Sequence, residues 1–244
     1  MGIFDKSRKK ENFSLTTNKN TLHKNLEFAA TEQYKLLRTN LNFTLPADQK
    51  CPIIGVTSSM RGEGKSTTAV NLSYVLAENN HNVLLIDGDL RIPSIAKKMD
   101  IKNTPGLTDF LMGFEKQQLS VFKSNLLDNW YIIPSGNLPP NPSELLGSSR
   151  METILNVLSE KFDYIVIDLP PVNVVSDALT ISRLITGMIV VIRSDYTEKK
   201  ELETCFRQLK LSNVKVLGCV MNESKDEKGS YSKYKKYYNY TSNT

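Results

Sequence analysis

A short glycine-rich segment holds the residues best suited to bind a phosphate group. The segment Gly62-Glu63-Gly64-Lys65-Ser66-Thr67 follows an apolar run and opens a helical pattern. Its glycines let the backbone curl so that successive N–H groups face an anion, and the start of the helix adds the positive end of its dipole. Lys65 can then reach the β- and γ-phosphates of a nucleotide, while Ser66 can offer its hydroxyl to Mg²⁺. The segment is therefore predicted to be a P-loop, although Ser59 stands where the usual pattern has its first glycine.

Acidic residues follow two other apolar runs. Val83 to Ile86 leads into Asp87 and Asp89, and Ile165 to Ile167 leads into Asp168. In parallel α/β sheets, ligands bind at the carboxyl ends of the strands. Carboxylates there can hold Mg²⁺ or accept a proton from an attacking hydroxyl. One aspartate at a strand end is often only a cap or turn residue, but three of them beside a P-loop favour a catalytic site.

These residues define a predicted site for a nucleoside triphosphate and Mg²⁺. The candidate catalytic residues are Lys65, Asp87 and Asp89. The candidate metal ligands are Ser66, Asp87, Asp89 and Asp168. The candidate nucleotide-binding residues are Arg61, Gly62, Glu63, Gly64, Lys65, Ser66, Thr67 and Asn222. Asn222 ends the last apolar run, where its amide could pair with adenine or simply terminate a strand.

Short apolar runs and longer amphipathic patterns alternate along the chain. Several of the runs have β-branched residues in succession, which suits strands that are buried on both faces. The predicted strands are Ile53–Thr57, Val83–Asp87, Trp130–Pro134, Tyr164–Asp168, Met188–Arg193 and Val216–Asn222. The predicted helices are Leu26–Phe43, Lys65–Glu78, Ser148–Phe162, Asp177–Ile185 and Glu198–Leu211. This alternation predicts an α/β fold with a mostly parallel sheet flanked by helices. Three prolines make Leu138–Ser143 a predicted surface loop.

The two ends of the chain differ in composition from its middle. The chain has 244 residues and a net charge of +5, and four of its first ten residues are basic. We expect residues 1–24 to be a flexible basic arm, 25–223 the folded domain and 224–244 a disordered tail. The tail carries a cluster of tyrosines: Tyr231, Tyr234, Tyr237, Tyr238 and Tyr240. No run approaches the roughly 20 apolar residues of a membrane span and no signal peptide is evident, so we expect a cytoplasmic chain. Its cysteines, Cys51, Cys205 and Cys219, are expected to be buried thiols.

Together these motifs resemble those of the bacterial tyrosine kinases of capsule and exopolysaccharide synthesis. The resemblance runs from about Leu26 to the C-terminus. The matching segments are Ser58–Ser66 (Walker A), Leu85–Arg91 (Walker A′), Ile167–Pro171 (Walker B), Pro139–Leu146, Ser176–Ala178 and the tyrosine cluster. A Walker A motif alone would identify only a very large superfamily, whereas the A′ motif together with the tyrosine tail is specific.

The resemblance implies a P-loop NTPase fold related to that of ParA/MinD-type ATPases, and phosphotransfer from ATP to tyrosine. Lys65 would hold phosphates, Ser66 would bind Mg²⁺ and Asp168 would position metal-bound water. Either Asp87 or Asp89 would act as the base, and the acceptors would be the tail tyrosines of a neighbouring subunit. The resemblance also implies a homo-oligomer such as a ring, with a chain-length-type membrane protein as the activating adaptor that recruits the kinase to the inner face of the cell membrane. A cognate tyrosine phosphatase is expected, and no nucleic acid.

Two positions depart from the family pattern. Arg61 replaces a proline that presets the phosphate loop. The family's subunit-contact helix reads Glu-x-x-Arg-x-x-Arg, and here the corresponding residues are Glu32, Lys35 and Arg38. Lysine is a weaker bidentate partner than arginine. These three residues are the candidate oligomer contacts, and the alternative is an ion pair between Glu32 and Lys35 within one helix.

Two other functions fit parts of the sequence. A ParA/MinD-like ATPase switch would share the P-loop, but those proteins typically carry a lysine five residues before Lys65, where this chain has Met60. A nucleic-acid-binding module could use the tail, because its tyrosines could stack on bases between lysines. The tail offers no folded platform for that role. ATP-dependent transfer to the tail distinguishes the kinase from both alternatives.

Overall fold

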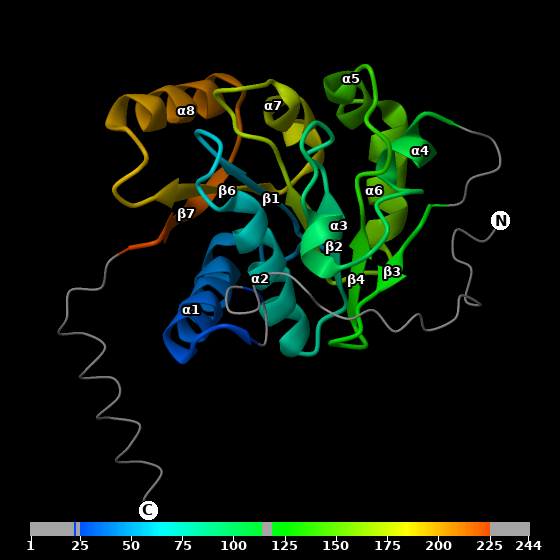
Figure 1. Ribbon diagram of the computed structural model, residues 1–244, viewed down its shortest axis with the longest axis horizontal. Helices are drawn as coiled ribbons and strands as arrows, with labels where there is room; N and C mark the ends of the chain where they lie inside the picture. The colour runs from blue at the N-terminus through cyan, green and yellow to red at the C-terminus, as the bar shows by residue number, and fades with distance from the viewer. Residues whose placement is uncertain (1–21, 23–24, 114–118, 225–244) are drawn as a thin grey trace, which may run out of the picture.

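The fold was established from a computed structural model of the chain, which describes residues 22, 25–113 and 119–224 (Figure 1). The predicted basic arm, residues 1–24, lies almost wholly outside the described residues. The predicted tail also lies outside them from residue 225 onward, and this part includes all five of its candidate acceptor tyrosines.

A seven-stranded sheet forms the centre of the molecule, in the order β3-β4-β2-β5-β1-β6-β7. The strands are β1 (Ile53–Ser58), β2 (Val83–Asp87), β3 (Phe122–Lys123), β4 (Trp130–Ile133), β5 (Tyr164–Asp168), β6 (Gly187–Arg193) and β7 (Val216–Asn222). Neighbouring strands are parallel, except that β3 pairs with β4 in the antiparallel direction. Because β2, β5 and β1 are neighbours, the segments that follow them meet at one edge of the sheet. Asp87 stands opposite Asp168 in the register of β2 and β5.

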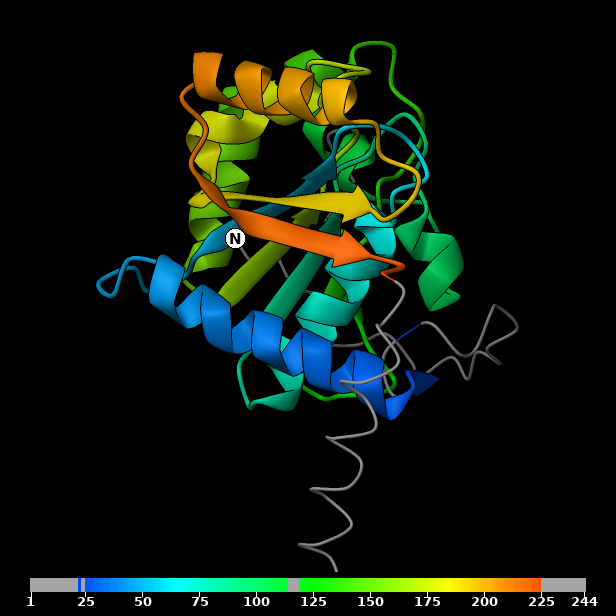
Figure 2. The same ribbon diagram turned by 90° about the vertical axis from the view of Figure 1, so that its left-hand side faces the viewer.

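Helices cover both faces of the sheet, because the central strands are buried on both faces (Figure 2). The helices on one face are α1 (Phe28–Thr44), α2 (Lys65–Glu78) and α3 (Ile95–Met99). The helices on the other face are α4 (Leu107–Leu111), α5 (Pro142–Leu146), α6 (Ser149–Ser159), α7 (Asp177–Ile181) and α8 (Lys199–Leu211). Each layer has its own apolar core, since alternate residues of a strand point to opposite faces. Ile54 and Val56 therefore pack with α2, whereas Ile165 and Ile167 pack with α6.

The structure confirms the predicted α/β fold, and its differences from the prediction are local. All six predicted strands are present, and the short edge strand β3 was not predicted. The segment predicted as a loop, Leu138–Ser143, is one only in part, because α5 begins at Pro142. Proline is tolerated in the first turn of a helix, where its missing N–H would have no partner. The predicted helix Asp177–Ile185 ends at Ile181 and continues as a 3₁₀ turn, Ser182–Leu184.

The three cysteines are not all buried. Cys51 and Cys205 are buried thiols, as predicted, but Cys219 is exposed. The prediction was wrong for Cys219 because it lies on β7, the last strand of the sheet, where alternate side chains can face solvent. Among the described helices, none has the length and apolar character needed to cross a bilayer.

Candidate active site

The P-loop connects β1 to α2 at the carboxyl edge of the sheet. Gly62 and Gly64 have φ angles of +80° and +95°, which L-residues with side chains rarely adopt. Gly64 immediately precedes the first turn of α2. A side chain there would also collide with the amide of Asn222. The positive φ angle therefore requires glycine at position 64, and a side chain there would also displace the Asn222 amide.

Lys65 lies between two of the predicted carboxylates. Its Nζ atom is 2.7 Å from Oδ2 of Asp89 and 3.4 Å from Oδ1 of Asp168. The lysine side chain is only 12% exposed. Burial alone would lower the pKa of Lys65, but Asp168 and Asp89 together raise it above the ordinary lysine value. Lys65 is therefore held as an ammonium ion where a nucleotide phosphate would bind.

Asp87 and Asp168 are buried side by side at the ends of β2 and β5. Oδ2 of Asp87 accepts hydrogen bonds from the backbone N–H groups of Ser94 (3.1 Å) and Ile95 (2.9 Å). Burial, reinforced by the charge of Asp168, raises the pKa of Asp87 to about 8. Burial likewise raises the pKa of Asp168, although Lys65 and Ser66 oppose that shift. At neutral pH this edge of the sheet favours a bound cation or a retained proton.

The donor set at this edge fits Mg²⁺. Oδ1 of Asp87 and Oδ2 of Asp168 are buried, and neither has a hydrogen-bond partner among the described residues. The same residues contain no cluster of three or more acidic, histidine or cysteine side chains arranged to hold a metal by themselves. Mg²⁺ commonly binds through one or two carboxylates completed by phosphate oxygens and water. Ser66, Asp87, Asp89 and Asp168 thus suit a metal that arrives with a nucleotide.

Glu63, a candidate nucleotide-binding residue, points into the protein. Its buried carboxylate accepts hydrogen bonds from the Ser59 hydroxyl (2.7 Å), the Met60 backbone N–H (2.9 Å) and the Thr197 hydroxyl (2.5 Å). Asn222 donates from its amide to the backbone oxygen of Glu63, at 3.1 Å. Both side chains hold the P-loop in shape, and the contribution left to Glu63 in nucleotide binding is through its backbone.

Arg193 and Tyr196 bind backbone oxygens of the P-loop. Nη1 of Arg193 is 3.1 Å from the backbone oxygen of Gly62, and Tyr196 donates its hydroxyl to the backbone oxygen of Arg61 at 3.2 Å. Arg193 also pairs with Glu223 at 2.7 Å. Sequence reasoning missed these residues, because nothing in the run after β6 indicates a contact with a loop about 130 positions earlier.

A second network joins the A′ segment to two other motifs. Arg91 pairs with the fully buried carboxylate of Asp177 at 2.9 Å, and Ser143 donates its hydroxyl to the same carboxylate. These three residues come from three separate segments that carry the family resemblance: the A′ motif, the proline-rich segment and Ser176–Ala178. The network fixes the loop that carries Asp89 against α5 and α7.

The candidate oligomer contacts lie on α1, away from the carboxylates. Lys35 pairs with Glu32 of the same helix at 2.9 Å, which is the alternative arrangement that the sequence allowed. Arg38 donates from Nη1 to the backbone oxygen of Val75 in α2, at 2.7 Å. In the single chain, Arg38 therefore joins α1 to α2, while Glu32 and Lys35 remain on the surface.

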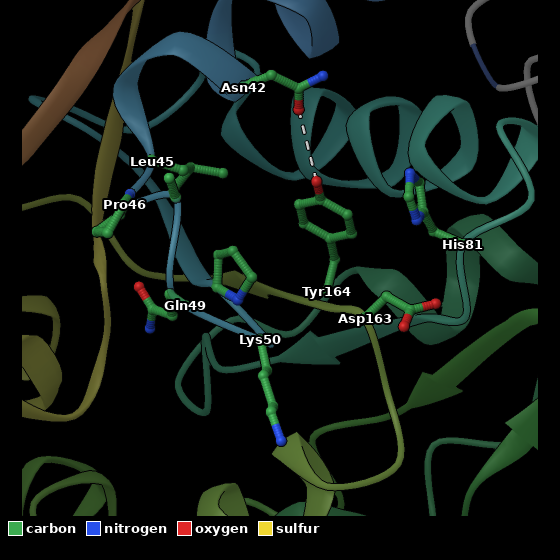
Figure 3. A pocket seen from close by; sticks show the side chains of 10 residues that line it. Asn42, Leu45, Pro46, Gln49, Lys50, His81, Asp163 and Tyr164 are labelled. Carbon is green, nitrogen blue, oxygen red and sulfur yellow. Dashed lines mark hydrogen bonds between the residues drawn. The ribbon is translucent and has the colours of Figure 1, made fainter.

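A hollow of about 320 Å³ lies at the opposite edge of the sheet (Figure 3). Its lining includes Asn42, Lys50, His81 and Tyr164, and the Tyr164 hydroxyl lies 3.5 Å from Oδ1 of Asn42. Tyr164 begins β5 and Asp168 ends it, so about 13 Å of strand separates this hollow from the carboxylates. The chemistry suggested by the sequence thus belongs to the P-loop edge.

Known proteins resemble this chain over most of its length. The model of a family described as an AAA domain matches residues 51–217. Tyrosine-protein kinase YwqD of Bacillus subtilis is 38% identical over 202 residues, covering 82% of this chain and 84% of the relative. Tyrosine-protein kinase CpsD of Streptococcus pneumoniae serotype 4 is 34% identical over 205 residues, covering 82% and 88%.

Solved structures of tyrosine kinases also resemble this chain. The kinase domain of the Escherichia coli tyrosine kinase ETK superposes with a TM-score of 0.77 at 27% identity, covering 88% of this chain and 87% of that domain. The chimerical protein CapA2B2 gives a TM-score of 0.74 at 30% identity, covering 79% and 84%. The septum site-determining protein MinD from Pyrococcus horikoshii, solved with Mg-ADP, gives 0.60 at 24% identity over 73% and 72%, which is a likeness of fold.

Proposed function

The chain belongs to the bacterial tyrosine-protein kinase family and carries an AAA domain, and from this premise we propose that it transfers the γ-phosphoryl group of ATP to tyrosines of its own C-terminal segment. The tyrosine oxygen forms a bond to the γ-phosphorus as the bond from that phosphorus to the β–γ bridging oxygen breaks, and ADP leaves. The supporting observation is Lys65, buried between Asp89 and Asp168 at the end of a P-loop.

The proposed roles of the residues follow from their placement. Backbone N–H groups of the P-loop and the ammonium of Lys65 would bind the phosphates and stabilise the charge that develops during transfer. Mg²⁺, held by Ser66 with Asp87, Asp89 and Asp168 nearby, would neutralise charge on the transferring group. The tyrosine proton would pass to Asp87 or Asp89.

The same proposal includes partners. The kinase would form a homo-oligomer, be activated and recruited to the inner face of the cell membrane by a chain-length-type membrane protein, and act in capsular or exopolysaccharide synthesis. A cognate tyrosine phosphatase would reverse the modification. Support comes from the family, from a relative named putative tyrosine-protein kinase CapB of Staphylococcus aureus, and from the similarity to the chimerical protein CapA2B2.

The decisive test is phosphotyrosine mapping on the purified protein with labelled ATP and Mg²⁺. The wild-type chain should become labelled on Tyr231, Tyr234, Tyr237, Tyr238 or Tyr240. Lys65→Met should reduce the label by at least 100-fold, because the transferring phosphate loses its buried cation. Lys97→Met, an exposed lysine on α3, is the matched control and should label normally.

A mixing experiment tests whether transfer occurs between subunits. A Lys65→Met chain with an intact tail is combined with an active chain truncated after Glu223. Label on the Lys65→Met chain supports transfer between subunits. If the wild-type chain hydrolyses ATP but never forms phosphotyrosine, the protein is a MinD-like switch and the kinase proposal is wrong.

A further inference from the structure

A second lysine approaches the phosphate-binding helix from α3. Nζ of Lys98 lies 3.2 Å from Oγ1 of Thr67, which is in the first turn of α2. Lys98 is partly buried, whereas its neighbour Lys97 is exposed. Consecutive residues of a helix point about 100° apart, so α3 directs Lys98 inward and Lys97 into solvent.

Lys98 forms no ion pair with any of the described residues. The first turn of α2 presents backbone N–H groups and the positive end of a helix dipole, which repel a cation. Burial lowers the pKa of Lys98. The charge of Asp168 opposes this shift, and the charges of Lys65 and Lys97 add to it.

We propose that Lys98 is a second phosphate-binding lysine, which contacts the polyphosphate chain of a bound nucleotide beside Thr67. A phosphate at the first turn of α2 would lie next to an ammonium group, a hydroxyl and free N–H groups, all of which are donors. Lys65 contacts Asp89 and Asp168 on one side of the site, and Lys98 contacts Thr67 on the other. The ligand class is a nucleoside diphosphate or triphosphate, and the inference rests on the nucleotide site of the proposed function.

The test compares binding of Mg-ADP to wild-type protein, Lys98→Met and Lys97→Met by calorimetry at two salt concentrations. Methionine keeps most of the apolar length of lysine and removes the charge. Lys98→Met should bind Mg-ADP about tenfold more weakly and with a smaller salt dependence, since one charged hydrogen bond is lost. Lys97→Met should bind as the wild type does. In phosphotransfer, Lys98→Met should raise KM for ATP more than it lowers kcat, because Lys65 lies among the carboxylates of the site and Lys98 contacts Thr67 instead.

Three possible results decide whether Lys98 binds phosphate. Unchanged Mg-ADP affinity in Lys98→Met overturns the inference. A lower unfolding temperature of Lys98→Met without nucleotide, with no recovery of ADP binding in Lys98→Arg, overturns it in favour of a packing role. Loss of ADP affinity in Lys98→Met, in a wild-type protein that never labels its tail, leaves the inference intact and removes the kinase proposal instead.

Discussion

At the scale of single residues, the main feature of the candidate active site is a pair of buried carboxylates that lie close together. Asp87 and Asp168 face each other across two neighbouring strands, and neither side chain is exposed. Like charges in a medium of low polarity resist ionisation together, so the folded chain favours a proton on one of them unless a cation is near. Lys65 supplies one positive charge, and bound Mg²⁺ would supply more.

This arrangement predicts that stability falls with rising pH when nucleotide and Mg²⁺ are absent. The pKa of Asp87 is about 8 in the folded chain against an ordinary value of 3.8, so between these values the folded state retains a proton that the unfolded state releases. The free energy of unfolding should therefore decrease as pH rises through this window. Asp87→Asn should remove this contribution, and at pH 8 should be more stable than the wild type by on the order of 1–2 kcal/mol.

Urea unfolding in EDTA, at pH 6 and pH 8, measures the effect. Between pH 6 and pH 8, the free energy of unfolding should fall further in the wild type than in Asp87→Asn. Adding Mg-ADP in place of EDTA should make the two pH dependences more alike. Equal losses in both proteins would show that the Asp87 carboxyl ionises as freely in the folded chain as in the unfolded one.

At the scale of elements, the site depends on how β6 and β7 end. The end of β6 contributes Arg193 to the contacts of the P-loop, the loop after it contributes Thr197, and the end of β7 contributes Asn222. Arg193 also pairs with Glu223, directly after β7. One guanidinium thus joins the phosphate loop to the start of the segment that carries the tyrosines.

We expect substitutions of this pair to separate nucleotide binding from tail phosphorylation. Arg193→Gln removes the contact with Gly62 and the contact with Glu223, so it should weaken Mg-ADP binding and slow tail labelling, each by a few fold. Glu223→Gln removes only the ion pair, so it should slow labelling while Mg-ADP affinity stays the same. The effects are modest because the pair is partly exposed. The measurements are calorimetry with Mg-ADP and labelling rates at saturating ATP.

The double variant provides the control. If Arg193 and Glu223 act on the tail through their contact, adding Glu223→Gln to Arg193→Gln should not slow labelling further. Fully additive effects, or an unchanged labelling rate in both single variants, would leave Arg193 with a role in the P-loop alone.

At the scale of the whole molecule, α1 is the element that we propose contacts a neighbouring chain. Arg38 is used within the chain to hold α1 against α2, while Glu32 and Lys35 form an ion pair on the surface. The three residues proposed for the subunit contact therefore fall into two groups. Glu32 and Lys35 remain available to a neighbouring chain, and Arg38 has a structural task of its own.

This division predicts different outcomes for two variants. The double substitution Glu32→Ala with Lys35→Ala should shift a sizing profile toward smaller species without changing the unfolding temperature. Arg38→Ala should cost about 1–2 kcal/mol, because Val75 loses its partner, and should lower the unfolding temperature by a few degrees. An unchanged elution volume for the double variant would limit Glu32 and Lys35 to their pair within the helix.

Features of the fold and site that depend on neighbouring positions could be predicted from the amino-acid sequence. The glycines and Lys65 of the P-loop are contiguous, so the loop and the helix that follows it could be predicted together. The apolar runs that became β1, β2, β4, β5, β6 and β7 were also recognisable, because buried parallel strands are apolar on both faces. The aspartates that follow two of these runs then indicated one edge of one sheet.

The way in which distant segments meet at this edge could not be predicted, because it depends on strand order and packing. The pairing of Asp87 with Asp168, the burial of Glu63, the use of Arg193 by the P-loop and the contact of Lys98 with Thr67 join positions that are 31 to 134 residues apart. The exposure of Cys219 and the attachment of Arg38 to Val75 likewise follow from which elements become neighbours. Local patterns record which face of an element is apolar, but the partner of a polar side chain depends on strand order and register, which no single segment specifies.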